Sequence, residues 1–398
     1  MKKLTTILII CLLLLSTMPV SVMAAIVEPP TIVDTLKAGE TERDSITVNL
    51  PTTPPKADVI FVFDATGSMG SQIAAMKSKA GAIMGDIDGS VDDVQFGVGS
   101  IVDYPHYYVN TLDPSYPNAY YGNSGDYAWL RNQDLTTSTA AVQTAINGLS
   151  AGGGADGPQD YTRALYESKE SFSWRADAKK FVVIFGDNWP HSYPSGASLG
   201  WNTYGADPGR DEDMTTPSDN LDFVPVVNSL RASNIIVIAG DCSGGYATPF
   251  YQYIATQTLG ARFDATSASA DDMADAIVDA IEGSTSAPIE TLTVTVREPE
   301  YASWVTVTPP SYSDVPWGDS RSFAVTITPP ADTKICGEVT IHLDVYGDGV
   351  LLGTTTVTKT IIGDACTPSP EFPTLALPVA MILGFAFIAY SIRSRKED

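Results

Sequence analysis

The chain has 398 residues, and its formal net charge is −24. It is too long for one ordinary domain, so at least two folded units are expected. The large excess of carboxylates excludes nucleic acid as a partner, because phosphates would be repelled rather than neutralised.

Residues 1–25 have the anatomy of a secretory signal peptide. Two lysines precede an apolar run from Ile7 to Leu15, and small residues follow up to an expected cleavage near Ala24 or Ala25. An uncleaved N-terminal anchor is the alternative, although the apolar run is short for a membrane span. We therefore expect the mature protein outside the cytoplasm.

Residues 26–55 carry a strand-like pattern, clearest from Asp44 to Leu50, in a segment too short to fold alone. We infer that these N-terminal strands belong to a β-sandwich completed later in the chain. The region between would then be an insertion, entered through the proline-rich hinge from Pro51 to Pro55. A mobile N-terminal tail is the alternative.

Residues 56–285 alternate between strand and helix patterns, which predicts an α/β fold with a doubly wound, mostly parallel sheet and helices on both faces. Continuous apolar runs are expected of central strands buried on both sides. They are Val59 to Phe63, Phe181 to Phe185 and Ile235 to Ala239. Helical spacing follows from Ile73 to Ile83, from Thr139 to Leu149 and from Asp271 to Glu282.

Residues 286–366 are rich in Thr and Val with strand alternation, and two Pro-Pro pairs interrupt them. This pattern predicts a small Ig-like β-sandwich. Cys336 and Cys366 bracket the segment and are predicted to form a disulfide outside the cell. Cys242 follows an apolar strand and is expected to be an inert core thiol.

Residues 367–392 include an uncharged apolar stretch that is long enough to cross a bilayer, and residues 393–398 form a basic tail expected in the cytoplasm. The bulk of the protein would then lie at the cell surface, anchored to the membrane by its C-terminal segment. The junction Pro370-Glu371-Phe372-Pro373, with the segments behind it, resembles archaeal PEF-CTERM sorting signals. That resemblance implies an archaeal source and a sortase-like enzyme that cuts here and attaches a lipid.

A carboxylate and two hydroxyls stand at alternate positions directly after the first buried strand, at Asp64, Thr66 and Ser68. In open α/β sheets, ligands bind at the carboxyl ends of the strands. Hard oxygen donors suit Mg²⁺, or Ca²⁺ or Mn²⁺. A loop without metal is the alternative, because the start of a helix also favours polar side chains.

This loop resembles the metal-ion-dependent adhesion site of von Willebrand factor type A (VWA) domains, which begins Asp-x-Ser/Thr-x-Ser. The resemblance covers about Asp58 to Glu282 and implies a Rossmann-like sheet. Three later segments resemble the integrin-β-like branch of that family. They are Phe96 to Pro105, the Gly-rich loop from Gly152 to Gln159, and Gly186-Asp187 followed by His191.

The resemblance implies that the loop from Asp64 to Ser68 holds the metal and that Asp187 contacts it through water or supports it by a hydrogen bond. The second loop departs from the family pattern, because Gln159 replaces a glutamate and Asp160 follows it. Whether Gln159, Asp160 or Asp156 faces the ion stays open. A glutamine can still offer a carbonyl oxygen.

The loop from Tyr104 to Trp129 is rich in tyrosine, and the resemblance places ligand choice there. We expect ligand contacts from Tyr107, Tyr108, Tyr120 and Tyr121, since tyrosines make rigid amphipathic surfaces. Packing of these rings onto their own domain is the alternative. His191 is expected to be an ordinary loop histidine, because no Cys or second His stands at zinc-ligand spacing.

Together these features predict a surface adhesion protein, in which a divalent cation binds an acidic group of an extracellular protein or surface polymer. The alternative is a structural envelope component that assembles through its VWA domain. A hydrolase is disfavoured, since no nucleophile with a paired base is visible in the sequence, and we expect no enzyme activity.

Overall fold

The computed structural model describes residues 26–52, 56–110, 112–214 and 219–363. The predicted signal peptide, the C-terminal apolar segment with its basic tail, and Cys366 lie outside these residues. Among the helices of the described ranges, none combines the length and apolarity needed to cross a membrane.

The region from Ala57 to Ser286 forms an α/β unit around a mostly parallel six-stranded sheet, which confirms the predicted fold class. The strand order is β11 (Arg262–Asp264), β10 (Ile235–Asp241), β9 (Lys179–Gly186), β4 (Ala57–Asp64), β5 (Val94–Ile101) and β8 (Leu130–Thr136). Only β8 pairs antiparallel with its neighbour among these described strands. Every residue of β4 is buried, as its apolar run predicts.

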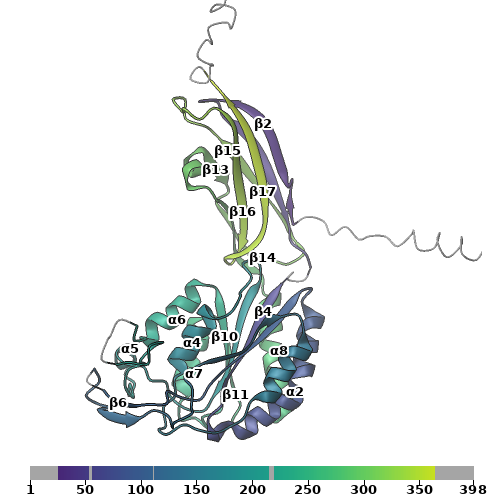
Figure 1. The fold of residues 1–398 in the computed structure, drawn as a ribbon. Coiled ribbons are helices and arrows are strands. Elements are labelled where there is room, and N and C mark those ends of the chain that lie inside the picture. The colour runs from purple at the N-terminus through teal and green to yellow at the C-terminus, as the bar shows by residue number, and fades with distance from the viewer. Residues whose placement is uncertain (1–25, 53–55, 111, 215–218, 364–398) are drawn as a thin grey trace, which may run out of the picture.

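Helices cover both faces of this sheet (Figure 1). They are α2 (Gly70–Ser90), α3 (Thr139–Gly148), α4 (Tyr161–Glu170), α5 (Ser195–Ser198), α6 (Phe223–Ala232), α7 (Thr248–Gln257) and α8 (Ala270–Ser286). Side chains of β4 alternate between the faces, because successive residues of a strand point in opposite directions. Phe61 and Phe63 share a core with α2, α3 and α8, and Ile60 and Val62 share a core with α4, α6 and α7.

The flanks of the α/β unit form a second, β unit of two sheets. One has the order β1 (Val27–Glu28), β3 (Glu42–Asn49), β15 (Ser320–Ile327) and β13 (Val305–Thr308). The other has the order β14 (Ser311–Val315), β12 (Ile289–Val296), β16 (Gly337–Gly347), β17 (Val350–Ile362) and β2 (Thr31–Lys37). In Figure 1 the purple N-terminal strands lie beside the yellow-green C-terminal strands.

Strand pairing therefore joins the two flanks directly. The strand β3 pairs antiparallel with β15, and β2 pairs parallel with β17. Because both sheets need strands from before and after the α/β unit, that unit is an insertion in the β unit. The strand β4 starts at the hinge, so its carboxyl end points away from the β unit, toward the end where Figure 1 shows β6 (Tyr107–Val109).

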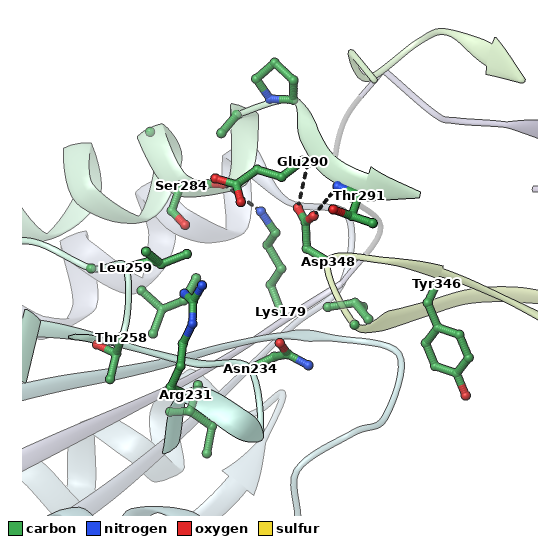
Figure 2. Close-up of a pocket in the computed structure, with 18 of the residues that line it drawn as sticks. Lys179, Arg231, Asn234, Thr258, Leu259, Ser284, Glu290, Thr291, Tyr346 and Asp348 are labelled. Atoms are coloured by element: carbon green, nitrogen blue, oxygen red, sulfur yellow. Dashed lines mark hydrogen bonds between the residues drawn. The ribbon is translucent and has the colours of Figure 1, made fainter. Parts of the chain in front are cut away.

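The two units meet around a pocket of about 750 Å³, shown in Figure 2. Its polar groups have partners within the protein. The Nζ of Lys179 donates to the carbonyl of Ser284 at 2.7 Å, and the carboxylate of Asp348 accepts from the backbone N–H of Thr291 at 2.8 Å. This pocket lies where α8 leads into β12, at the opposite end of the sheet from the Asp64 loop.

Candidate metal centre

The carboxylate of Asp64 organises the loop that follows β4. Its Oδ1 accepts from the backbone N–H of Thr66 at 2.8 Å and from the Thr66 hydroxyl at 2.6 Å. Its Oδ2 accepts from the hydroxyl of Tyr161. Asp64 is fully buried, and this burial raises its pKa to about 6, although the hydrogen bonds from Thr66 and Tyr161 oppose the shift.

A cavity of about 240 Å³ opens above this loop. Five of the predicted metal ligands line it: Thr66, Ser68, Asp156, Gln159 and Asp187. Because the Thr66 hydroxyl donates its proton to Asp64, its lone pairs remain available, and the Ser68 hydroxyl oxygen lies 3.4 Å from it. Asp64 itself does not line the cavity, so it acts on the cavity through Thr66.

Gln159 offers this cavity an oxygen with no other partner. The side chain is buried, its Nε2 donates to the carbonyl of Gly157 at 3.2 Å, and its Oε1 has no hydrogen bond. A buried carbonyl without a partner is costly, and a bound cation would remove that cost. The donor set of Thr66, Ser68, Gln159 and Asp187 therefore fits a hard divalent cation.

Asp160, the third candidate in the second loop, lies elsewhere. It is fully buried and does not line the cavity, and neither of its carboxylate oxygens has a hydrogen-bond partner. Burial raises its pKa well above the usual range, and the charge of Asp207 adds to the shift.

Tyr161 is a site residue that sequence reasoning missed. Its hydroxyl donates to Asp64 and accepts from the backbone N–H of Asp187 at 3.0 Å, so it links the loops after β4 and β9. It is the first residue of α4, directly after Asp160. That position, following a motif loop, is the signal that could have found it.

The Gly-rich loop approaches its neighbours too closely for larger residues. Gly153 has a φ of +79°, and a Cβ atom there would lie 2.1 Å from Asp126 Oδ1. Gly154 has a φ of +76° and would place a Cβ 3.2 Å from the Thr66 side chain. These glycines let the second loop close over the first.

The tyrosine loop divides into buried and exposed rings. Tyr108 and Tyr121 are buried against Tyr104, so the prediction that they contact a ligand is wrong. The Tyr108 hydroxyl donates to the Glu212 carbonyl at 2.9 Å and thus holds the loop to its own domain. Strand alternation in β6, which turns neighbouring residues to opposite sides, could have revealed this division.

Tyr107 and Tyr120 remain as predicted contact residues. They are 49% and 64% exposed, and their ring centroids lie 4.8 Å apart across the hairpin of β6 and β7 (Asn118–Tyr120). Their rings form an exposed aromatic pair on the α/β unit.

The larger pocket between the two units is a weaker candidate site. Among the described residues that line it, none leaves a buried polar side-chain atom without a hydrogen-bond partner. At the Asp64 loop, by contrast, unpartnered buried oxygens converge on a small cavity. Unpaired buried polar atoms point to a missing ligand, so the site lies at the loop.

No protein-family model matches the chain, and no curated protein matches it. Two solved structures are similar to it. A von Willebrand factor type A protein from Catenulispora acidiphila is 16% identical, and the match covers 86% of this chain and 74% of that one with a TM-score of 0.37. The pilus adhesin SpaC from Lactobacillus rhamnosus GG is 12% identical, and the match covers 81% of this chain and 46% of the adhesin with a TM-score of 0.36.

Proposed function

We propose that this protein binds an acidic group of a partner through a divalent cation, Mg²⁺ or else Ca²⁺ or Mn²⁺, held at the cavity of the Asp64 loop. The observation that carries the proposal is the convergence of Thr66, Ser68, Gln159 and Asp187 on one open cavity. The bound ion would supply positive charge to a ligand carboxylate. The chain's own residues hold that charge in place and leave one side open.

The charge around the cavity supports an anionic ligand. Asp187 and Asp156 line the wall and Asp64 lies behind it, whereas Gln159 stands where a carboxylate would add further negative charge. A ligand carboxylate is therefore opposed less than it would be by a glutamate. The exposed pair of Tyr107 and Tyr120 would add apolar contact area.

We place this binding at the cell surface. The support is the signal-like segment 1–25 and the apolar segment 367–392, which would anchor the protein in the membrane. A sortase-like enzyme that cuts at the Pro370 to Pro373 junction, and an archaeal source, follow from the PEF-CTERM resemblance. Partners would be extracellular proteins or surface polymers, and the integrin-β-like order of the loops is consistent with this role.

A structural envelope component is the second candidate, and hydrolysis is disfavoured. The insertion of the α/β unit at the far end of a β unit presents the cavity away from the chain ends, which suits contact with another molecule or another copy. Binding to a heterologous partner that chelator abolishes would support adhesion. Self-association of the purified protein would support assembly.

Substitution of Ser68 tests the site. Ser68 is exposed at the cavity, so Ser68→Ala should keep the fold and lower Mg²⁺ affinity about tenfold through loss of one oxygen ligand. Isothermal titration calorimetry on the chelator-treated mature protein measures this. Ser71→Ala, one exposed serine further along the same helix, is the matched control and should bind Mg²⁺ as the parent does. Equal affinity in both variants would remove the metal from this loop.

A further inference from the structure

A second group of ligand atoms lies beside the first cavity and is not used by it. One atom each from Asp103, Asp156 and His191 lies within 4.8 Å of the other two. Asp103 Oδ2, Asp156 Oδ1 and His191 Nε2 are all buried and have no hydrogen-bond partner. These residues come from three separate loops, after β5, before α4 and after β9.

Each carboxylate in this group is anchored by one oxygen and leaves the other free. Asp103 Oδ1 accepts from the backbone N–H of Tyr104 at 2.7 Å, and Asp156 Oδ2 accepts from the hydroxyl of Tyr116 at 2.6 Å. The second oxygen of each therefore has a fixed position but no proton donor. Such anchoring is how proteins orient metal ligands.

The imidazole of His191 is held in the same way. It is fully buried, its Nδ1 bonds to the backbone carbonyl of Tyr204, and its ring stacks on Tyr121 with centroids 3.7 Å apart. A carbonyl accepts only, so the proton sits on Nδ1 and the Nε2 lone pair is bare. Burial lowers the pKa of His191 to about 3, so the ring stays neutral at physiological pH.

The surroundings add negative charge but no compensating side chain. Asp160 lies close enough that its charge, after burial, is the main cause that raises the pKa of Asp103. Within the described part of the chain, no lysine or arginine forms an ion pair with Asp103, Asp156 or Asp160. Buried carboxylates without a partner are strongly disfavoured unless a cation or a shared proton compensates them.

We propose that Asp103, Asp156 and His191 form a second cation site, next to the Ser68 cavity, that takes a transition-metal ion such as Zn²⁺ in preference to Ca²⁺ or Mg²⁺. The choice of metal follows from the nitrogen ligand. Neutral imidazole suits Zn²⁺ and its neighbours in the first transition row, whereas Ca²⁺ and Mg²⁺ take oxygen ligands almost exclusively. The sequence-based expectation that His191 is an ordinary loop histidine is thereby replaced.

Such a site would connect the tyrosine loop to the Gly-rich loop. Asp103 immediately precedes the buried Tyr104, and His191 stacks on Tyr121, so an ion here would bind both ends of the loop that carries Tyr107 and Tyr120. A ligand that binds only the folded state also raises the melting temperature. The site does not depend on a metal at Ser68.

The test is calorimetric titration of the chelator-treated mature protein with Zn²⁺, in the presence of excess Mg²⁺ to occupy the Ser68 cavity. We expect one Zn²⁺ per chain, a raised melting temperature, and at least tenfold weaker binding in His191→Gln. Ser68→Ala should bind Zn²⁺ as the parent does, which separates this site from the first. The matched control is His106→Gln, which alters an exposed histidine paired with Glu212.

Replacing Zn²⁺ with Co²⁺ gives a second readout, because a nitrogen ligand changes the visible d–d absorption and His191→Gln should abolish that change. Asp103→Asn, which preserves side-chain shape, tests the site if His191→Gln fails to fold. The proposal is overturned if the parent takes up no Zn²⁺, as a proton shared by Asp103 and Asp156 would predict. It is also overturned if His191→Gln binds Zn²⁺ as tightly as the parent, or if Ca²⁺ displaces Zn²⁺ at equal concentration.

Discussion

Two clusters of acidic side chains, one in each unit, differ in what lies between them. In the β unit, Asp34, Glu42 and Asp44 surround the fully buried ammonium of Lys359, whose Nζ lies 3.3, 2.8 and 3.2 Å from their carboxylates. Desolvation lowers the pKa of Lys359, but the hydrogen bonds to Glu42 and Asp44 outweigh it, so the pKa is raised. The protein supplies its own cation there.

At the carboxyl edge of the α/β sheet, the acidic side chains have no such partner. Asp103 and Asp160 are buried with unpartnered oxygens, and burial raises the pKa values of both carboxyls. The comparison shows how to tell a structural charge cluster from a binding site. A cluster completed by a side chain stabilises the fold, whereas a cluster left open is arranged for a cation from solution.

Removal of the internal cation should produce the largest effect on stability. Lys359→Met leaves three carboxylates uncompensated between β2, β3 and β17, and we expect a loss of about 3 kcal/mol of unfolding free energy. This is the low end for a buried ion pair, because Asp34 remains half exposed. Urea unfolding followed by circular dichroism measures it.

The control for this variant is Lys37→Met, which alters an exposed lysine 3.9 Å from Glu40. It should change stability by less than about 0.5 kcal/mol. Adding Ca²⁺ should restore part of the loss in Lys359→Met, since the cluster would then resemble the open one. A variant as stable as the parent would show that Lys359 does not compensate these carboxylates.

Asp64→Ala should both abolish cation binding and destabilise the α/β unit. The sequence led us to expect a solvent-facing loop, but Asp64 is fully buried and accepts from Thr66 and Tyr161. Its loss leaves those hydroxyls without an acceptor, at a cost of about 2 kcal/mol, and lowers Mg²⁺ affinity at least a hundredfold. Calorimetry and thermal melts on one preparation measure both effects. A destabilised variant that still binds Mg²⁺ normally would separate Asp64 from the metal.

The stability of the metal-free protein should depend on pH through the same carboxyls. Burial raises the pKa of Asp64 to about 6 and that of Asp156 to about 7, so the folded state holds these protons more tightly than the unfolded state. Their contribution to stability is complete below about pH 4 and is lost as the pH rises through 6 and 7.

For Asp64 alone we expect a decrease on the order of 2 kcal/mol between pH 4 and pH 8. Differential scanning calorimetry in the presence of chelator measures it as a falling melting temperature. Saturating Mg²⁺ should reverse the trend, because a cation binds the deprotonated carboxyls. The same pH profile with and without Mg²⁺ would contradict cation binding at these groups.

Gln159→Glu should produce the smallest and most specific effect. A third carboxylate at the cavity, added to Asp156 and Asp187, should tighten Mg²⁺ binding about tenfold and weaken an acidic ligand by a similar factor. The two affinities should move in opposite directions when measured on one variant by calorimetry with Mg²⁺ and with a carboxylate ligand such as acetate-bearing polymer. A parallel rise in both would indicate that the ligand group is not acidic, and no change in either would place residue 159 away from the ion.

Much of the α/β fold followed from local patterns. The apolar runs at Val59 to Phe63 and Phe181 to Phe185 lie within β4 and β9, and the helical spacing after the first run lies within α2. Burial on both faces leaves a continuous apolar run in the sequence, which a reader can see without a structure. Cys242 is a buried free thiol, as expected from its place after β10. The pattern of Asp64, Thr66 and Ser68 also located the loop where polar oxygens converge.

Tertiary structure alone decided which side chains meet. Tyr161 joins Asp64 to Asp187, Gln159 turns an unpartnered oxygen to the cavity, and His191 meets Asp103 and Asp156 from another loop. These contacts join residues far apart in the chain, so strand order and loop packing determine them, and no local period records them. The sequence by itself determined which segments are buried and where polar residues interrupt them, because burial and backbone geometry act on neighbouring residues. The partner of each buried charge is a property of the folded chain, because only folding brings the loops together.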